Sequence, residues 1–230
     1  MQNRIINRYK IYAFRNKKDF LMEIEDKQKI LVAMNAEKIL KKDERLREIV
    51  NNNIGYSDGI GAVMALKQKN LDSIKIAGSE FWLDIIEYFH KTKSFYILGS
   101  TSKVIEKTVS KLKQEYPSIN IVGYRDGYLK NGDKEDLIRD LSLRKPDIVF
   151  VAQGTPKQEF LMQELSQMHT ALYMGLGGSF DIYGGDKKRA PKIFLTLHLE
   201  WFYRLLKEPM RFGRQLIYIK FMILLKSKRL

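Results

Sequence analysis

The clearest indication of the fold is the segment Pro146-Asp-Ile-Val-Phe-Val-Ala-Gln-Gly-Thr-Pro-Lys-Gln158. Its apolar run, Ile148 to Ala152, is typical of a buried strand, and the glycine and proline that follow end that strand before a helix-like stretch. Similar apolar runs recur along the chain, with amphipathic stretches between most of them: Ile30 to Met34, Phe95 to Leu98, Ile119 to Val122 and Ala171 to Met174. This alternation predicts an α/β fold with a Rossmann-like, largely parallel sheet flanked by helices.

Three of the predicted strands lead into glycine-containing turns that could hold a nucleotide diphosphate. Ligands of open α/β sheets bind beyond the carboxyl ends of the strands, where helix N-termini offer unpaired N–H groups. The alternative is an ordinary turn, in which glycine supplies an unusual backbone angle and Ser or Thr caps the helix. None is a Walker loop or a full dinucleotide fingerprint, so a nicotinamide dehydrogenase is weakly supported. The turns are Gly99-Ser-Thr-Ser102, Gly154-Thr-Pro-Lys157-Gln158 and Gly177-Gly178-Ser-Phe-Asp181.

A fourth segment, Ser57-Asp-Gly-Ile-Gly61, places an acid beside two glycines just before a helix-like stretch from Ala62 to Lys69. The glycines allow a ligand to approach the backbone closely, and Asp58 could accept a proton from an attacking hydroxyl. An Asp-Gly pair is also common as a plain turn or helix cap.

The 230 residues, 44% of them hydrophobic, can bury one substantial core, and we expect an α/β domain over residues 1–191 with a helical appendage over 192–230. The chain has no cysteine, which fits a reducing compartment and makes the cytoplasm the default location. The basic N-terminal residues lack the apolar run of a signal peptide. The longest apolar run, Leu216 to Leu225, contains Lys220 and is too short to span a bilayer.

The net charge of +14 is concentrated at the C-terminal end. From Asp186 to Leu230 there are twelve lysines and arginines against three acids, which indicates a polyanionic partner such as nucleic acid, anionic lipid or a diphosphate substrate. Leu216 to Leu225 mixes aliphatic and aromatic residues between basic flanks, as an interfacial helix on anionic headgroups does. The alternative is a helix that packs on the core with its lysines in solvent.

Several short segments, taken in their order and spacing, resemble the WecG/TagA/CpsF glycosyltransferases (glycosyltransferase family 26) from about Ile30 to Gln215. The matching segments include the Ser57–Gly61 segment and the turns that begin at Gly154 and Gly177. The others are Asn35-Ala-Glu37, Ala77-Gly-Ser79, Pro146-Asp147, Lys188-Arg-Ala-Pro191, Leu199-Glu-Trp-Phe-Tyr-Arg-Leu205 and Lys207-Glu-Pro209.

The resemblance implies an inverting, metal-independent transferase that moves a hexose or N-acetylhexosamine from a UDP-sugar to an undecaprenyl-diphosphate-linked sugar in surface polysaccharide, teichoic acid or capsule synthesis. It implies that Asp58 is the general base, and that the tail associates with the inner face of the cell membrane and closes over the site. Substrate contacts are expected from Asn35, Lys75, Gln158, Gly99, Gly154, Lys157, Gly177, Gly178 and Asp181, and phosphate contacts from Arg204, Arg211 and Arg214.

Two residues depart from the family pattern. Ala33 stands where the family has a threonine, and Lys75 replaces an arginine, so that a bidentate guanidinium becomes a point charge. These changes leave the sugar open: N-acetylmannosamine is the leading expectation, and glucose, galactose or a uronic acid are the alternatives.

Cofactors and metals are not expected. The sequence contains no Asp-x-Asp triplet of the kind that holds a metal–nucleotide complex, and its three histidines (90, 169 and 198) are scattered. A nucleic-acid-binding module is disfavoured because the basic residues lie among aliphatic runs and no standard motif is present. A non-catalytic membrane scaffold would have no need of an acid in a glycine turn. The sequence leaves open whether the protein forms a homo-oligomer.

Overall fold

A computed structural model describes residues 1–186 and 212–230. The described strands are β1 Gln2–Ile6, β2 Tyr9–Ala13, β3 Ile30–Met34, β4 Ile54–Ser57, β5 Ser94–Gly99, β6 Asn120–Arg125, β7 Ile148–Ala152 and β8 Leu172–Gly175. The described helices are α1 Lys17–Ile24, α2 Ala36–Ile39, α3 Glu44–Asn52, α4 Ile60–Gln68, α5 Gly78–Phe89, α6 Ser102–Glu115, α7 Asp133–Arg144, α8 Lys157–Met168, α9 Ser179–Tyr183 and α12 Phe212–Lys226.

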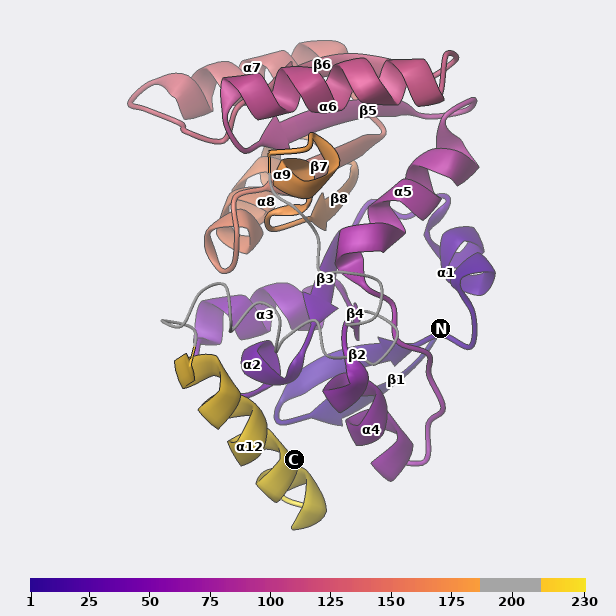
Figure 1. Ribbon diagram of the computed structural model, residues 1–230, viewed down its shortest axis with the longest axis vertical. Coiled ribbons are helices and arrows are strands. Elements are labelled where there is room, and N and C mark those ends of the chain that lie inside the picture. Colours follow the sequence, from indigo (N-terminus) through magenta and orange to yellow (C-terminus); the bar gives the residue numbers. More distant parts are fainter. Residues whose placement is uncertain (187–211) are drawn as a thin grey trace.

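The strands form one eight-stranded sheet in the order β1-β2-β4-β3-β8-β7-β5-β6 (Figure 1). β1 pairs with β2 antiparallel, and every other pair is parallel. The two halves of the chain meet where β3 pairs with β8, through Ile30 with Tyr173 and Leu31 with Met174. The predicted α/β fold with a largely parallel sheet is therefore confirmed.

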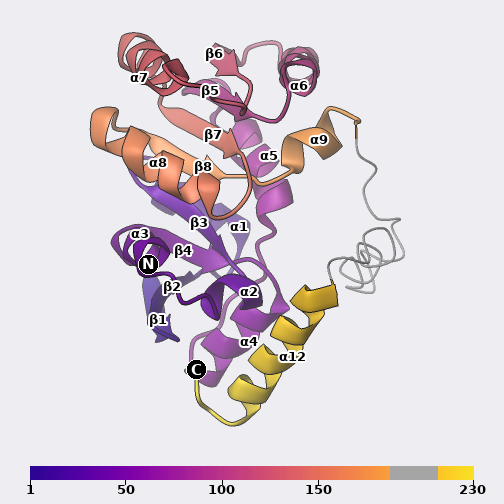
Figure 2. The ribbon, with the colours of Figure 1, turned by 90° about the vertical axis from the view of Figure 1, so that its left-hand side faces the viewer.

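Helices cover both faces of the sheet, and each face has its own apolar core. One core contains side chains from α2, α3, α4, α7, α8 and α12, and the other contains side chains from α1, α5, α6 and α9. Figure 2 shows the molecule edge-on, with α8 and α3 on one side of the strands and α5 and α9 on the other. The central strands are buried on both faces, so they read as continuous apolar runs.

The predicted strands agree with the observed ones to within one to three residues at each end. β3 and β7 begin and end where the apolar runs do, whereas β6 extends to Arg125 and β8 begins at Leu172. β1, β2 and β4 were not predicted. Their residues include the polar or small Gln2, Asn3, Lys10 and Gly55, which interrupt the apolar pattern.

The C-terminal helix packs against the core, and α12 contacts both α2 and α4. Among the helices of residues 1–186 and 212–230, none is long and apolar enough to cross a membrane. The expected boundary between residues 191 and 192 lies outside the described residues, as do the motifs at Lys188–Pro191, Leu199–Leu205 and Lys207–Pro209.

Candidate functional site

The turns singled out in the sequence line up along the carboxyl edge of the sheet. Each follows the last residue of a parallel strand, and β4, β3, β8 and β7 are consecutive in the sheet, so their turns are neighbours. Asp58 follows β4, Asn35 follows β3, Gly177 comes two residues after β8, and Gly154 comes two residues after β7. Ligands of open α/β folds bind at this edge, so the topology brings most of the expected site residues to one place.

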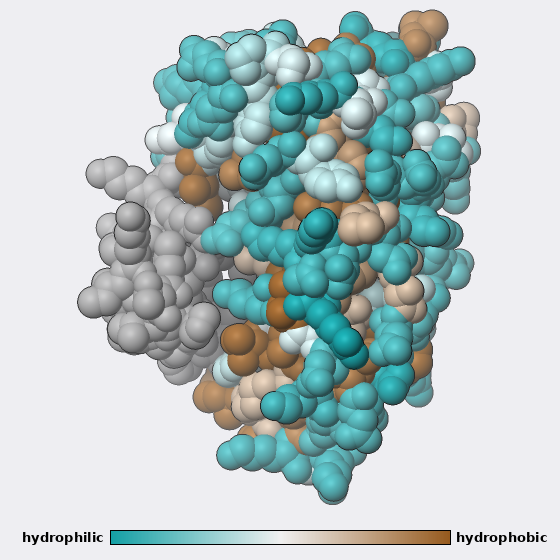
Figure 3. All heavy atoms as spheres, turned by 90° about the vertical axis from the view of Figure 1, so that its right-hand side faces the viewer, coloured by the Kyte–Doolittle hydropathy of each residue, from teal (hydrophilic) through white to brown (hydrophobic). Residues whose placement is uncertain are grey.

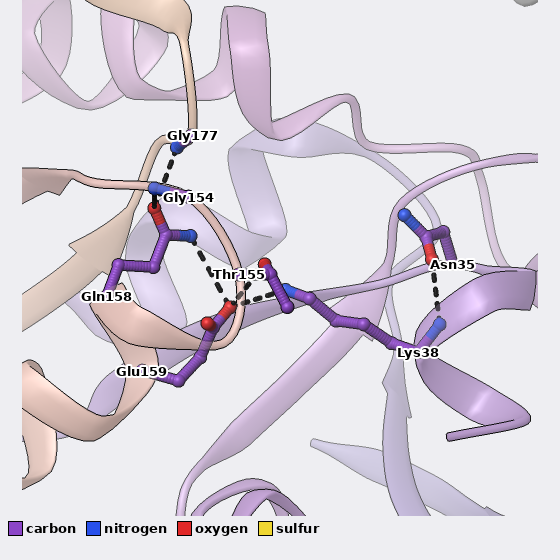
Figure 4. A network of polar contacts seen from close by, with 7 residues as sticks. All are labelled: Asn35, Lys38, Gly154, Thr155, Gln158, Glu159 and Gly177. Carbon is purple, nitrogen blue, oxygen red and sulfur yellow. Dashed lines mark hydrogen bonds and ion pairs between the residues drawn. The ribbon is translucent and has the colours of Figure 1, made fainter. Parts of the chain in front are cut away.

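Gln158 joins two of these turns. Its side chain is only 3% exposed, and its Oε1 accepts hydrogen bonds from the backbone N–H of Gly154 at 3.1 Å and of Gly177 at 2.9 Å (Figure 4). Both glycines have positive φ angles, 79° and 59°, which other residues rarely adopt. Because these bonds use both lone pairs of the amide oxygen, Gln158 can meet a ligand only through its Nε2 group or through the turns that it holds.

Glu159 extends the network across the sheet to the turn after β3. Its Oε1 lies 2.6 Å from Nζ of Lys38, and it also accepts from Oγ1 of Thr155 at 3.0 Å and from Nε2 of Gln158 at 3.4 Å. Glu159 is 1% exposed and Lys38 6%, so the ion pair is buried. Oε2 of Glu159 is buried and has no hydrogen-bond partner among residues 1–186 and 212–230. One carboxylate thus connects the turns after β3 and β7.

Asn35 and Asp58 occupy adjoining turns. Oδ1 of Asn35 accepts from the backbone N–H of Lys38 at 3.0 Å and caps α2, while the N–H of Asp58 donates to the carbonyl of Met34 at 2.9 Å. Gly59 has a φ of 112°, and a Cβ built on it would lie 4.0 Å from Cβ of Asn35. Both polar side chains are half-buried at the edge of the sheet. A proton acceptor and a side-chain amide therefore lie together where a substrate could reach them.

The floor beneath these turns contains a buried tyrosine. The hydroxyl of Tyr56 is fully buried, and no partner for it exists within the described ranges. Burial raises the pKa of Tyr56 well above its ordinary value, and the carboxylates of Asp58 and Glu159 raise it further. Tyr56 therefore remains a neutral hydroxyl beside two acids.

A second group of expected residues gathers at the ends of β5 and β8. Oγ of Ser100 donates a hydrogen bond to Asp181, and its backbone carbonyl accepts from the N–H of Gly127 at 2.8 Å. Gly99 has a φ of 141°, and a Cβ there would lie 2.4 Å from the carbonyl oxygen of Ala152, so only glycine fits. The turn after β5 is thus held against α9 and against the loop after β6.

The remaining expected residues are exposed, or their side chains lie outside the described part of the structure. Lys75 is exposed on the extended segment that leads to α5, next to Ile76, whose N–H donates to the carbonyl of Ser57 at 2.9 Å. Lys157 is exposed in the first turn of α8, and Gly178 is exposed where α9 begins. Arg204 and Arg211 lie outside the described residues, and Arg214 is described only through the backbone of α12.

A hollow of about 710 Å³ lies at the opposite, amino edge of the sheet. Pro146 and Asp147 before β7 and Ala171 before β8 are among the residues that line it. It contains none of the expected site residues. Because ligands of parallel sheets bind at the carboxyl ends of strands, we place the candidate site at that edge and not in this hollow. Within the parts of the chain that the structure describes, no three His, Asp or Glu side chains are grouped as metal ligands.

Sequence reasoning did not single out Lys38 or Glu159. Glu159 directly follows the Gly154–Gln158 turn and was assigned no role, and Lys38 looks like any surface lysine near a helix start. The two residues are 121 positions apart, so no local pattern relates them. The sequence feature that could have pointed to Lys38 is its position, three residues after Asn35 at the end of a predicted strand.

The buried pair gives a prediction about stability. Replacing Glu159 by Leu leaves the Lys38 ammonium buried without a counter-charge, and we expect the free energy of unfolding to fall by about 3–5 kcal/mol. The double variant Lys38→Met/Glu159→Leu removes both charges and should recover most of that loss. Urea unfolding measures the free energy of unfolding of the single and the double variant. A double variant that is no more stable than Glu159→Leu would contradict the role of the buried ion pair.

Residues 10–230 match the Glycosyl transferase WecG/TagA/CpsF family. This range is longer at both ends than the region of resemblance described above, which runs from about Ile30 to Gln215. The match covers nearly the whole chain, and it includes all the turns at the carboxyl edge. This protein therefore belongs to the WecG/TagA/CpsF family of glycosyl transferases.

Proposed function

We propose that the protein transfers a hexose or N-acetylhexosamine, with inversion and without a metal, from a UDP-sugar to an undecaprenyl-diphosphate-linked sugar. The observation that carries the proposal is the position of Asp58, half-buried at the carboxyl edge and beside Asn35, in a chain that belongs to a glycosyl transferase family. N-acetylmannosamine is the sugar we favour; glucose, galactose and uronic acids remain alternatives.

Inversion requires one in-line displacement at the anomeric carbon. In this proposal the carboxylate of Asp58 takes the proton from the acceptor hydroxyl as its oxygen bonds to that carbon. The bond from the carbon to the UDP oxygen breaks, and UDP leaves with the bonding pair. Asn35 keeps its Nδ2 group for a sugar oxygen, since its Oδ1 caps α2.

The departing diphosphate needs N–H donors and positive charge. The turns after β5, β7 and β8 lead into helices whose first backbone N–H groups can serve as donors, although the N–H groups of Gly154 and Gly177 themselves are bonded to Gln158. Lys157 is exposed in the first turn of α8, and Lys75 is exposed beside the end of β4. We assign Arg204, Arg211 and Arg214 to the phosphates as well, because they extend this positive charge along the chain. Gln158 acts here through the two turns that it connects.

In this proposal the uridine of the donor binds at the ends of β5 and β8, where Ser100 and Asp181 lie. The loop after β6 closes on the turn after β5, through Gly127 and Ser100, and leaves the ring of Tyr128 66% exposed. An exposed aromatic ring is a stacking surface for a base, and Asp181 is an acceptor for N–H or hydroxyl groups. We propose that Tyr128 and Asp181 bind the nucleoside.

The surface of α12 supports membrane association. Leu216, Ile219 and Ile223 are exposed and share one face of the helix, while Phe221 and Leu225 on the opposite face are buried. The side of the molecule away from α12 is mostly hydrophilic, with hydrophobic patches scattered over it (Figure 3). An apolar face beside exposed Lys220 and Lys226 suits an anionic headgroup layer.

This arrangement favours an enzyme that works in the cytoplasm, peripherally on the inner face of the membrane. There it would meet a lipid-linked acceptor whose sugar lies near the headgroups. We propose that residues 1–191 form the catalytic domain and residues 192–230 a membrane-associating appendage.

The role of Asp58 leads to the first test of function. The amide of Asp58→Asn keeps the shape of the side chain but cannot take a proton, so turnover should fall by about 10² to 10⁴-fold while UDP binding persists. Single-turnover transfer and calorimetric titration with UDP measure the two quantities. Near-normal turnover would remove Asp58 from the mechanism.

Chelation tests the absence of a metal from the reaction. Since backbone N–H groups and basic side chains can neutralise the leaving diphosphate, transfer should continue in EDTA at its rate in untreated buffer. Product formation from a UDP-sugar and a lipid-linked acceptor is the measurement. Loss of transfer that magnesium or manganese restores would refute metal independence.

Vesicle binding tests the exposed face of α12. Replacing Leu216, Ile219 and Ile223 by Gln should abolish the binding to anionic vesicles that persists at high salt, because salt screens charges but not apolar burial. Replacing Lys220 and Lys226 by Gln should remove only the part of the vesicle binding that is sensitive to salt. We expect the binding free energy to weaken by about 1 kcal/mol per lysine. Vesicle co-sedimentation at two salt concentrations measures this, with circular dichroism as the control for folding. Equal salt dependence in both variants would refute the assignment.

A further inference from the structure

Phe221 of α12 is completely buried against two helices that begin at the candidate site. A Cβ built on Gly61 would lie 3.0 Å from Cε1 of Phe221 and 3.5 Å from Cβ of Ala36. The phenylalanine ring therefore lies against the backbone of Gly61, with Ala36 beside it. Gly61 has no positive φ angle, so what a side chain lacks at this position is space.

These contacts lie directly behind the candidate site. Ala36 is the first residue of α2 and follows Asn35, and Gly61 is the second residue of α4, three residues after Asp58. Further along the helix, Nε2 of Gln68 at the end of α4 donates to the carbonyl of Leu225 at 2.7 Å. Figure 2 shows α12 lying alongside α4 and α2. The C-terminal helix is thus attached to both ends of α4 and to the start of α2.

We propose that Phe221 is a positioning residue: its ring fixes the first turns of α2 and α4 relative to each other, and so fixes Asp58 relative to Asn35. This inference rests on the proposed role of Asp58 as the base. Phe221 touches no substrate and acts only through Ala36 and Gly61. Its role differs from that of the tail arginines, which we assign to phosphates.

Packing makes the effect plausible in magnitude. Protein interiors are close-packed, so removing or adding one methyl group at such a contact shifts its neighbours. A misplacement of about 1 Å between a base and the group it serves can lower a rate by about 100-fold. The glycine at position 61 and the alanine at position 36 leave room for the ring and for little else.

The experiment compares four variants of the full chain: Phe221→Leu, Gly61→Ala, the double variant Gly61→Ala/Phe221→Leu, and Phe89→Leu. Phe89 is a matched control, because it is 1% exposed and lies at the far end of α5, where it lines the hollow at the amino edge of the sheet. The same substitution there removes similar buried volume without touching α2, α4 or α12.

Two readouts are needed. The first is hydrogen exchange of the amides of residues 35–39 and 58–64. The second is transfer from a UDP-sugar to an acceptor with a short lipid chain, which dissolves without detergent. The kcat and the KM for the donor are measured separately. Phe221→Leu and Gly61→Ala should speed exchange in both segments and lower kcat by roughly 10- to 100-fold with the donor KM unchanged. Phe89→Leu should do neither.

The double variant provides the decisive comparison. The methyl group of Gly61→Ala fills space that Phe221→Leu vacates, so the pair should regain most of the kcat that either single variant loses. The proposal is overturned if exchange is unchanged in the single variants, if Phe89→Leu lowers kcat as much as Phe221→Leu, or if the double variant regains nothing. If the wild-type protein transfers no sugar, the proposed function fails, and hydrogen exchange alone still decides whether Phe221 holds the two turns.

Discussion

The candidate site depends on the hydrogen bonds and the ion pair of two adjacent side chains, Gln158 and Glu159. The amide oxygen of Gln158 accepts from two glycine turns, and Oε1 of Glu159 accepts from Lys38 on the far side of β8. Together they join the ends of β7, β8 and β3. The strand pairing between the two halves of the chain is short, and α8 also packs on α3 and β3. The contacts of Gln158 and Glu159 add to this interface at the carboxyl edge, where the two sets of turns face each other. A buried pair of this kind stabilises little by itself, but breaking it is costly, which favours one arrangement of the turns.

In our proposal the carboxyl edge of the sheet divides the chemistry between the two halves of the chain. The turns after β3 and β4 carry Asn35 and Asp58, which suit the acceptor hydroxyl. The turns after β5, β7 and β8 carry the glycines and Asp181, which suit the nucleotide. A displacement reaction needs the two substrates in line, so a site at the meeting point of two halves is physically well suited to it. The buried Tyr56 hydroxyl and the free Oε2 atom of Glu159, each without a partner among the described residues, lie beneath this meeting point.

The C-terminal helix α12 has two apolar faces, one buried and one exposed. Phe221 and Leu225 complete the core on α2 and α4, and the opposite face exposes Leu216, Ile219 and Ile223 beside lysines. The interpretation as a packed helix is confirmed for one face, and the interfacial interpretation is our proposal for the other face. A helix with two apolar faces needs a partner for each, and the core covers one of them. In our proposal the membrane supplies the other, so that lipid contact and the position of Asp58 depend on the same fifteen-residue helix.

Local sequence patterns were enough to predict the fold class, the family and five of the eight strands that the structure describes, because continuous apolar runs and glycine turns are local features. The sequence also predicted that three of these turns could hold a nucleotide diphosphate, since ligands of open α/β sheets bind beyond the carboxyl ends of strands. It could not identify β1, β2 or β4, whose polar and small residues obscure the pattern, nor the roles of Lys38, Glu159 and Phe221. Those depend on partners distant in the chain: 121 residues separate Lys38 from Glu159, and Phe221 meets Gly61 only when α12 folds back. Tertiary structure alone decided these contacts, because burial and charge pairing follow from where the chain returns in space and not from its local order.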